Sequence, residues 1–360
     1  MKKVLIATKP DDLHAILVSI ALETKGHQCV MWYTGDFPEQ QSLSFRIGEN
    51  KLRWKAKGKN FNIDHDAFDV IWLRRPVKRM ALDKIHEDDK PFALKEAAQL
   101  FDTVWRVTNQ ESWWVNYHEN ARKSNCKLLQ LKLAKEAGLT IPETLMSNDV
   151  SEICQFIKKY KKVIYKTFYP MYWQEQTSLR LAYTTPISEE DITQNLTAHL
   201  VPGIYQALLP KKFELRVTYF GSFHVCVKLD SQIHDRGKED WRYIPAEQLS
   251  VVPYDLPEEI DAMCQTIMRQ SGLQFGCIDL IVTPDNDYYF LEINEAGQFL
   301  WIEQANPDIK MLDIFSEFLI NGKDCFDGHD KKMNKPQLSM QAMMSKAMKK
   351  MRDNCQHHQV

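Results

Sequence analysis

Two strongly apolar runs, 275–283 and 287–294, constrain the fold more than any other feature of this 360-residue chain. A short polar segment containing Pro, Asp and Asn separates them, and residues of these types favour a turn. Each run has the length of a single strand and is bounded by turn residues. The pair therefore predicts a buried antiparallel hairpin.

Three polar residues interrupt this hairpin at Asp279, Glu292 and Asn294. If the turn is centred between residues 285 and 286 and no bulge intervenes, the two carboxylates lie directly opposite each other, with Cβ atoms roughly 4.5–5.5 Å apart. Like charges in that position destabilise a sheet unless a cation neutralises them. Asn294 lies two residues beyond Glu292 and so points to the same face. Oxygen ligands of this kind, completed by phosphate oxygens, suit Mg²⁺, whereas a solvated sheet face is the alternative.

The composition is that of an ordinary globular protein, with 44% hydrophobic and 26% charged residues, and the length predicts two or three subdomains. A formal net charge of −2 argues against a nucleic-acid partner bound by bulk charge. No window approaches the roughly 18 apolar residues of a membrane span, so no membrane partner is expected. The eight cysteines form no CxxC pair, which favours free thiols and a cytoplasmic location.

Strand, helix and strand alternate at the start of the chain, in residues 2–33, and predict an N-terminal α/β domain of about 110 residues. In the tail, methionines at helical spacing oppose basic residues. Packing is the favoured role and a partner site is the alternative, while no other feature supports the membrane contact that a basic amphipathic helix can make. The remaining predicted elements are a hairpin at 45–54, a strand at 69–73, a helix at about 121–137, strands at 163–166, 204–209, 213–220 and 222–229, and a helix from Glu258 to Gly272.

Several basic side chains could hold a triphosphate. Lys166 ends an apolar strand, and Lys127 lies in the first turns of a helix, where a bound anion would account for a cation. Arg216 shares a strand face with Glu214, and Arg242 offers a second planar fork that suits phosphate. Solvated lysines and surface ion pairs are the alternatives. The chain lacks the P-loop motif, which argues against a P-loop NTPase. It also lacks a GxGxxG motif after the first strand and a GxSxG elbow, which argues against a dinucleotide-binding fold and a Ser–His–Asp hydrolase.

Taken in order, these segments resemble the ATP-grasp fold over roughly residues 1–320. The matching segments are Asn125-Cys126-Lys127, Gly138-Leu139-Thr140-Ile141-Pro142-Glu143-Thr144, Val163-Ile164-Tyr165-Lys166, Tyr205-Gln206-Ala207-Leu208-Leu209, and Asp279 with Glu292-x-Asn294. The resemblance implies an α/β (α+β) architecture. Its parts would be an N-terminal α/β pre-ATP-grasp domain at 1–115, a central domain at 116–202, a C-terminal antiparallel-sheet catalytic domain at 203–325, and a linker with a tail helix at 326–360.

Within that fold, the chain is most similar to the graspetide maturases, the microviridin-type ligases that cross-link ribosomal peptides. The segments that carry this similarity are Trp72-Leu73-Arg74-Arg75-Pro76, Tyr183-Thr184-Thr185-Pro186-Ile187, Glu214-Leu215-Arg216-Val217, Ser231-Gln232 with Asp240-Trp241-Arg242, and the long run from Glu292 to Glu303. The run departs from the family pattern at Glu295, where Pro is usual. That departure alters the loop after the metal ligands but leaves the ligands intact.

The resemblance implies a reaction in which ATP phosphorylates an Asp or Glu side chain of a precursor peptide. A Ser or Thr hydroxyl then attacks to give an ω-ester, or a Lys amine attacks to give an ω-amide. ATP and Mg²⁺ are the implied cofactors, with the metal on Asp279, Glu292 and Asn294. The implied ATP contacts are Lys127, Lys166, Glu214 and the hinge segment Gln206, Ala207 and Leu208, and the implied catalytic arginines are Arg216 and Arg242.

A peptide site is implied as well. Arg74 and Arg75 end a predicted parallel strand and are expected to steer an acidic core peptide to the active site, with structural ion pairing as the alternative. The leader peptide is expected on the central domain near 168–200. Asp191 and Asn195 are the expected contacts there, and helix capping is the alternative for Asp191. Relatives form homodimers, so a homodimer is implied.

Two other functions remain open at this point. The first is an ATP-grasp ligase that adds free amino acids, as glutathione synthetase and the ribosomal-protein glutamate ligases do. The second is a regulator that binds nucleotide without catalysis, against which the intact lysines, arginines and metal ligands weigh.

Overall fold

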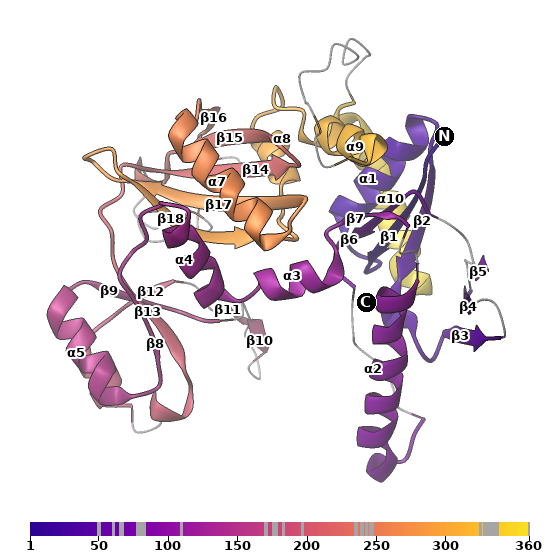
Figure 1. Ribbon diagram of the computed structural model, residues 1–360, viewed down its shortest axis with the longest axis horizontal. Coiled ribbons are helices and arrows are strands. Elements are labelled where there is room, and N and C mark those ends of the chain that lie inside the picture. The colour runs from indigo at the N-terminus through magenta and orange to yellow at the C-terminus, as the bar shows by residue number, and fades with distance from the viewer. Residues whose placement is uncertain are drawn as a thin grey trace.

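The computed structural model describes residues 1–48, 52–59, 62–64, 68–76, 84–108, 111–168, 172–174, 179–181, 184–195, 198–233, 237, 241, 244, 248–323, 326 and 338–358. Figure 1 shows two lobes. The N-terminal lobe contains the indigo start of the chain with the yellow C-terminal helices beside it. The second lobe contains the magenta and orange middle of the chain.

A parallel sheet forms the centre of the N-terminal lobe. Its strands are β1 (Lys3–Thr8), β2 (Gln28–Tyr33), β6 (Val70–Leu73) and β7 (Trp113–Val115), in the order β2-β1-β6-β7. The inner strand β1 is almost entirely buried, as expected of a parallel strand with helices or loops on both faces. Helix α1 (Leu13–Thr24) follows, and the side chain of Asp12 caps it by accepting from the backbone N–H of Ala15. The predicted strand–helix–strand start is confirmed.

Three tryptophans between residues 105 and 114 also belong to this lobe. Trp105 lies near the end of α2 (Lys90–Val107), a long helix that the sequence analysis did not predict, and Trp114 lies in β7. Only the end of α2 is buried, and Figure 1 shows its beginning projecting from the lobe. The predicted hairpin at 45–54 is confirmed as part of a small antiparallel sheet. Its strands are β3 (Gln41–Ile47), β4 (Leu52–Gly58) and β5 (Asn62–Asp64), with β4 in the middle.

The helix predicted at 121–137 is two helices. The first, α3 (His118–Ser124), ends before Asn125, and α4 (Lys127–Glu136) begins with its own extended N-cap residue, Cys126. The break places Lys127 in the first position of α4.

The central part of the second lobe is a four-stranded antiparallel sheet of order β12-β9-β13-β8. Its strands are β8 (Thr144–Ser147), β9 (Val163–Lys166), β12 (Thr185–Ile187) and β13 (Gly203–Ala207). Helices α5 (Val150–Tyr160) and α6 (Glu189–Thr193) pack on it around Ile153, Ile157 and Ile192. Short elements complete this part: β10 (Tyr172–Gln174), β11 (Leu179–Leu181) and the 3₁₀ turn η3 (Ala198–Leu200).

A five-stranded sheet of order β16-β15-β14-β17-β18 carries the candidate site. Its strands are β14 (Phe213–Phe220), β15 (Phe223–Leu229), β16 (Val251–Pro253), β17 (Phe275–Val282) and β18 (Tyr288–Asn294). Helix α7 (Glu258–Ser271) packs against one face, through Cys264, Ile267 and Met268. Successive residues of a strand point to opposite faces of the sheet. The residues that alternate with those packed against α7 therefore point to the face away from α7.

The C-terminal helices are α8 (Leu300–Ala305), α9 (Met311–Asn321) and α10 (Met340–His357). Helices α9 and α10 lie against α1 of the N-terminal lobe, whereas α8 lies beside the five-stranded sheet of the second lobe (Figure 1). The methionine face of α10 packs into the core cluster that also contains most of α1, and Lys350 of α10 lies 3.1 Å from the hydroxyl of Ser19. Packing is thus the role of the predicted tail helix. Among the described helices, none is long and apolar enough to cross a membrane.

Candidate active site

The hairpin of β17 and β18 places Asp279 directly opposite Glu292, as predicted, but the predicted route to that register is wrong. Next to the turn, Val282 pairs with Tyr288, so the turn is centred on Asp285. The register then shifts between Asp279 and its neighbour, where β18 contains one extra residue. A β-bulge of this kind corrects the one-residue difference and returns the carboxylate to the face of Asp279.

The oxygen cluster is compact. The amide nitrogen of Asn294 lies 3.1 Å from Asp279 Oδ2 and 3.2 Å from Glu292 Oε1, so one side chain contacts both carboxylates. Asp279 is the one position of β17 that is not fully buried, and all three residues are partly accessible. The structure thus brings together the three predicted metal ligands on the sheet face opposite α7.

Cations already neutralise this cluster in part. Arg216 is the cross-strand partner of Asp279 on β14, and its Nη1 donates to both carboxylate oxygens, at 2.7 and 2.8 Å. Burial, the largest single influence, would lower the pKa of Arg216, but the acidic groups around it, first of all the Asp279 carboxylate, together raise that pKa. Lys127 at the start of α4 forms an ion pair with Glu292. Each of the opposed carboxylates therefore has one cationic partner.

The donor set fits Mg²⁺ bound together with phosphate. Magnesium favours one or two carboxylates and completes its shell with water and phosphate oxygens, so a site with two carboxylates and an amide oxygen is suitable. No group of three His, Cys, Asp or Glu side chains forms a metal cage among the residues described. A half-turn of the Asn294 amide exchanges its nitrogen for an oxygen, which would convert a hydrogen-bond donor into a ligand.

Lys166 is the second predicted ATP lysine and lies at the end of β9. Its Nζ donates to Gln206 Oε1 at 2.8 Å, and the amide of Gln206 in turn donates to the hydroxyl of Thr144 at 2.9 Å. Gln206 is buried, with 3% of its surface exposed, so its side chain fixes the position of the lysine. Gln206 is also the first residue of the predicted hinge. The backbone N–H of Ala207 donates to Glu143 O at 2.9 Å, so other backbone atoms of the hinge would have to contact an adenine.

The other predicted residues differ in surroundings. The backbone N–H of Leu208 in the hinge donates to Lys162 O at 2.9 Å. Glu214 is buried between Lys211, 3.0 Å away, and the hydroxyl of Ser231, which donates to it at 2.9 Å. Burial is the largest influence on Glu214 and raises its pKa. Arg242 lies outside the described residues.

The two residues expected at a leader site lie on the exposed side of α6. Asp191 forms a reciprocal capping box with Ser188, whose hydroxyl donates to it at 2.6 Å. Asn195 lies just after the helix, where its backbone N–H donates to Ile192 O at 3.3 Å. Asp191 thus has the capping duty that the sequence left open.

Arg74 and Arg75 differ in burial, although they are adjacent in sequence. Arg74 is buried, with 1% of its surface exposed, and its Nε lies 3.2 Å from Asp12 Oδ2. Burial, the largest single influence, would raise the pKa of Asp12, but the Arg74 guanidinium, its other charged neighbours and a backbone hydrogen bond together lower that pKa. Arg75 is exposed beside it at the carboxyl edge of the parallel sheet. Arg74 therefore has the structural ion pair that the sequence left as the alternative, and Arg75 remains accessible to a peptide.

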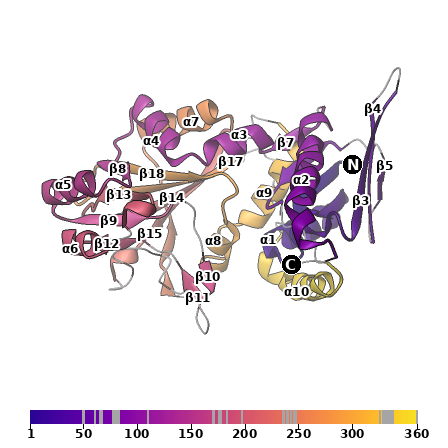
Figure 2. The same cartoon turned by 90° about the horizontal axis from the view of Figure 1, so that it is seen from below.

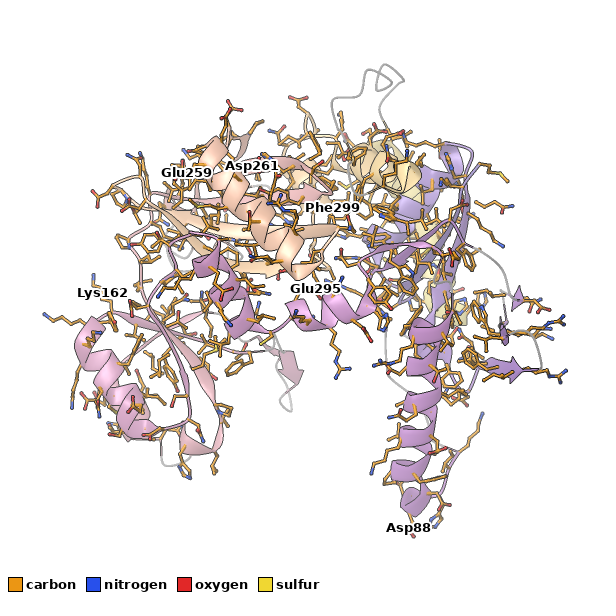
Figure 3. All side chains as sticks on the ribbon, viewed as in Figure 1. Asp88, Lys162, Glu259, Asp261, Glu295 and Phe299 are labelled. Atoms are coloured by element: carbon orange, nitrogen blue, oxygen red, sulfur yellow. The ribbon has the colours of Figure 1, made fainter. Side chains whose placement is uncertain are left out.

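The loop after the metal ligands, residues 295–300, is held by side chains to which the sequence analysis assigned no such contact. Arg74 donates to the carbonyl oxygens of Ala296 and Gly297, the second at 3.1 Å. His14 Nε2 accepts from the backbone N–H of Phe299 at 3.3 Å and of Leu300 at 3.2 Å. Figure 3 places Glu295 and Phe299 on the side of the second lobe that faces the N-terminal lobe.

Two asparagines complete this hold on the loop. Asn116 donates to Glu295 O at 2.9 Å and to Phe275 O at 2.7 Å. Asn125 donates to the Glu295 side chain at 2.7 Å, a contact that the Pro of the family pattern could not make. The contacts of His14 and Asn116 could not be predicted from local sequence, because their partners lie more than 150 residues away. Asn125 belongs to the segment that matches the ATP-grasp pattern around Lys127, but the sequence assigned it no role.

Comparison with known proteins supports this fold. Residues 3–122 match the family model described as the MvdD pre-ATP grasp domain. The macrocyclase MdnC from Microcystis aeruginosa, bound with the precursor peptide MdnA, is 26% identical with a TM-score of 0.77, and the match covers 89% of this chain and 100% of that chain. MdnB from the same organism is 25% identical with a TM-score of 0.74, covering 89% and 99%. A comparison with curated protein sequences finds no match.

A further solved structure shares the fold at lower identity. It is a RiPP-associated ATP-grasp ligase from Chryseobacterium gregarium in complex with ADP and a leader and core peptide, 24% identical with a TM-score of 0.79, covering 90% of this chain and 98% of that chain. The predicted ATP-grasp architecture is thus confirmed. The chain has the fold of the ATP-grasp ligases, and residues 3–122 match their MvdD-type pre-ATP-grasp domain.

Proposed function

We propose that the chain activates Asp or Glu side chains of a ribosomal precursor peptide and joins them to Ser or Thr hydroxyls, or to a Lys amine, to form rings. The observation that carries the proposal is the row Arg216–Asp279–Glu292, which crosses three adjacent strands with Asn294 beside it. The solved relatives support the substrate class, because MdnC was determined with a precursor peptide.

ATP with Mg²⁺ supplies the phosphoryl group that activates the carboxylate. The residues of this chain position the ATP and the peptide and neutralise the charge of the phosphates. Asp279, Glu292 and Asn294 would hold the metal. Lys127 at the start of helix α4 and Lys166 at the end of strand β9 would hold the phosphates. Positioning and charge neutralisation account for most of the catalysis of phosphoryl transfer, so no side chain need form a covalent bond.

Arg216 has a second role in the proposal. Its guanidinium is already fixed by Asp279 and also donates from Nη2 to Gln298 O at 3.2 Å. A fixed cation stabilises developing negative charge without reorganising at the moment of reaction. Arg242 is proposed to assist on the same grounds of chemistry.

The peptide contacts and the assembly are part of the same proposal. Arg75 is exposed at the sheet edge and would meet an acidic core peptide, while the leader would dock on the central domain beside Asp191 and Asn195. We expect a homodimer. We also expect a cytoplasmic location, since the seven described cysteines are all free thiols.

The direct test is mass spectrometry on a co-expressed candidate precursor, a small acidic peptide with Thr, Ser or Lys that is encoded beside the gene. Each ring should appear as the loss of one water. Asp279→Asn and Glu292→Gln should abolish the losses, because each removes a charge that the metal needs. Arg75→Gln, which leaves the oxygen cluster intact, should retain them with a higher KM.

Two outcomes would contradict the proposal. Release of ADP with a free amino acid and no peptide would assign the chain to the amino-acid ligases. Nucleotide binding without ADP release in the presence of the peptide would point to a regulator. Unchanged water losses in Asp279→Asn would refute the metal assignment alone.

A further inference from the structure

The small sheet of β3, β4 and β5 presents a one-sided basic face. Along its middle strand β4, Arg53, Lys55 and Lys57 are exposed, while Trp54 and Ala56 between them are buried. Strict alternation of this kind places every cation on the same face. Lysines often protect exposed edge strands from pairing, but β4 is not an edge, so edge protection does not explain them.

The pairing between β3 and β4 also places two like charges opposite each other. Arg46 of β3 lies directly opposite Arg53 of β4, and both are exposed. Like charges in that position destabilise a sheet, just as two opposed carboxylates do. Lys55 has Asp64 of β5 at 2.8 Å, but within the described part of the chain no carboxylate forms an ion pair with Arg46, Arg53 or Lys57. Of the four cations of this face, only Lys55 therefore has an ion-pair partner among the residues that the structure describes.

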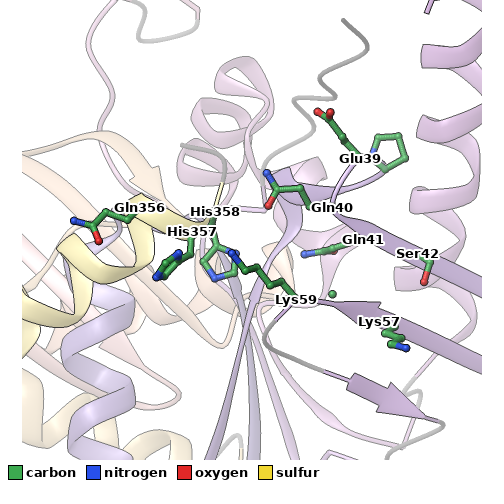
Figure 4. A pocket seen from close by; sticks show the side chains of 11 residues that line it. Glu39, Gln40, Gln41, Ser42, Lys57, Lys59, Gln356, His357 and His358 are labelled. Atoms are coloured by element: carbon green, nitrogen blue, oxygen red, sulfur yellow. The ribbon is translucent and has the colours of Figure 1, made fainter. Parts of the chain in front are cut away.

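An open pocket continues this face at the end of β4. Its volume is about 860 Å³, and Lys57, Lys59 and His357 line it (Figure 4). His358 also lines the pocket, and its ring lies 2.6 Å from the buried carboxylate of Asp36. Glu39, the acidic group of the lining, already has Lys84 as a partner. The pocket thus adds Lys59 to the cations of the face.

The location of the face is compatible with a long flexible ligand. β1, β2 and β6 run parallel, so their carboxyl ends share one edge, where the exposed Arg75 lies. The segment that leads to β3 leaves from the same edge. Figures 1 and 2 both place β3, β4 and β5 at the end of the molecule opposite α5. A peptide that reaches the active site past Arg75 could therefore continue onto this face.

We propose that the face formed by Arg46, Arg53, Lys55 and Lys57, with the adjoining pocket, binds an extended acidic segment of the precursor peptide. The inference rests on the proposed function, which makes an Asp- and Glu-rich peptide the substrate. From Arg53 to Lys59 an extended chain spans about 20 Å, which about six residues of an acidic segment would match. The site would hold carboxylates that await activation, away from the metal.

The test uses a fluorescein-labelled peptide of alternating Glu and Thr, with the matching Gln and Thr peptide as its uncharged control. Fluorescence anisotropy should show binding of the acidic peptide that weakens with added salt. R46Q/R53Q should weaken it about tenfold, as expected for the loss of two exposed charge contacts. The matched control K346Q/K349Q changes the net charge equally on the exposed side of α10 and should leave both binding and peptide-dependent ADP release unchanged.

Equal affinity in wild type and R46Q/R53Q, or no binding of the acidic peptide, would overturn the inference. So would tighter binding of a labelled single-stranded oligonucleotide that is lost in the same variant, because it would assign the face to nucleic acid. Failure of the wild type to release ADP would instead contradict the proposed function, since the anisotropy measurement needs no turnover.

Discussion

At the scale of single residues, neighbouring side chains of the same type can have opposite roles. The dipeptide of Arg74 and Arg75 looks uniform in sequence, yet the first arginine is buried against Asp12 and the second is exposed. Which arginine turns inwards depends on Asp12 and on the loop at 296–297, and neither is adjacent in sequence. Local pattern alone could therefore assign both to a peptide but could not separate them.

This difference predicts contrasting mutants. Arg74→Ala leaves Asp12 as an unpaired buried charge and should lower the free energy of unfolding by roughly 3–5 kcal/mol. Arg75→Ala should change it by no more than about 0.5 kcal/mol, as is usual for an exposed site. Urea denaturation of both variants measures the two values. Equal effects would show that Arg74 is not a structural cation.

At the scale of elements, the site hairpin shows what sequence could and could not predict. The apolar runs and the shared face of Glu292 and Asn294 follow from alternation and were confirmed. The pairing of Asp279 with Glu292 was also confirmed, but a bulge and not the predicted turn produces it. The position of the turn and the bulge were not predictable, since both depend on how the chain closes around Asn286, which has φ of 68°. Likewise, α2 was missed because its beginning projects from the lobe and buries little.

The turn gives a prediction at this scale. Asn286→Val should lower the free energy of unfolding by about 1–2 kcal/mol, because a β-branched residue tolerates a positive φ poorly. Asn286→Gly should be nearly neutral. Both variants lose the contact from Lys212 to the Asn286 side chain, so the difference between them isolates the backbone effect. Thermal unfolding followed by circular dichroism would measure it, and equal midpoints would contradict the assigned turn.

At the scale of the whole molecule, the N-terminal lobe supports the loop next to the metal ligands. His14 does so as a neutral acceptor, and burial, the largest influence, lowers its pKa to about 3. The unfolded chain protonates the same ring near pH 6.5. Below that pH the unfolded state binds the extra proton, so the stability that depends on His14 is complete above pH 6.5 and falls as the pH drops towards 3.

His14→Gln should therefore flatten the pH dependence of stability. Between pH 6.5 and 5, this one group should cost the wild type about 2 kcal/mol of unfolding free energy, and the variant should lack that loss. Glutamine keeps an acceptor oxygen but has no proton to gain. The other histidines are common to both proteins, so the difference in slope reports on His14. Parallel curves would mean that the ring is not buried in its neutral form.

The contact of α10 with α1 joins the two ends of the polypeptide. Residues 15–22 of α1 are buried on every side, and α10 supplies part of that cover. The buried pair of Asp36 and His358 spans 322 positions of the sequence. During synthesis, the apolar helix α1 of the first lobe thus stays uncovered until α10, more than 300 residues later, leaves the ribosome. Nascent and prematurely terminated chains would accordingly be the forms that chaperones bind and proteases remove.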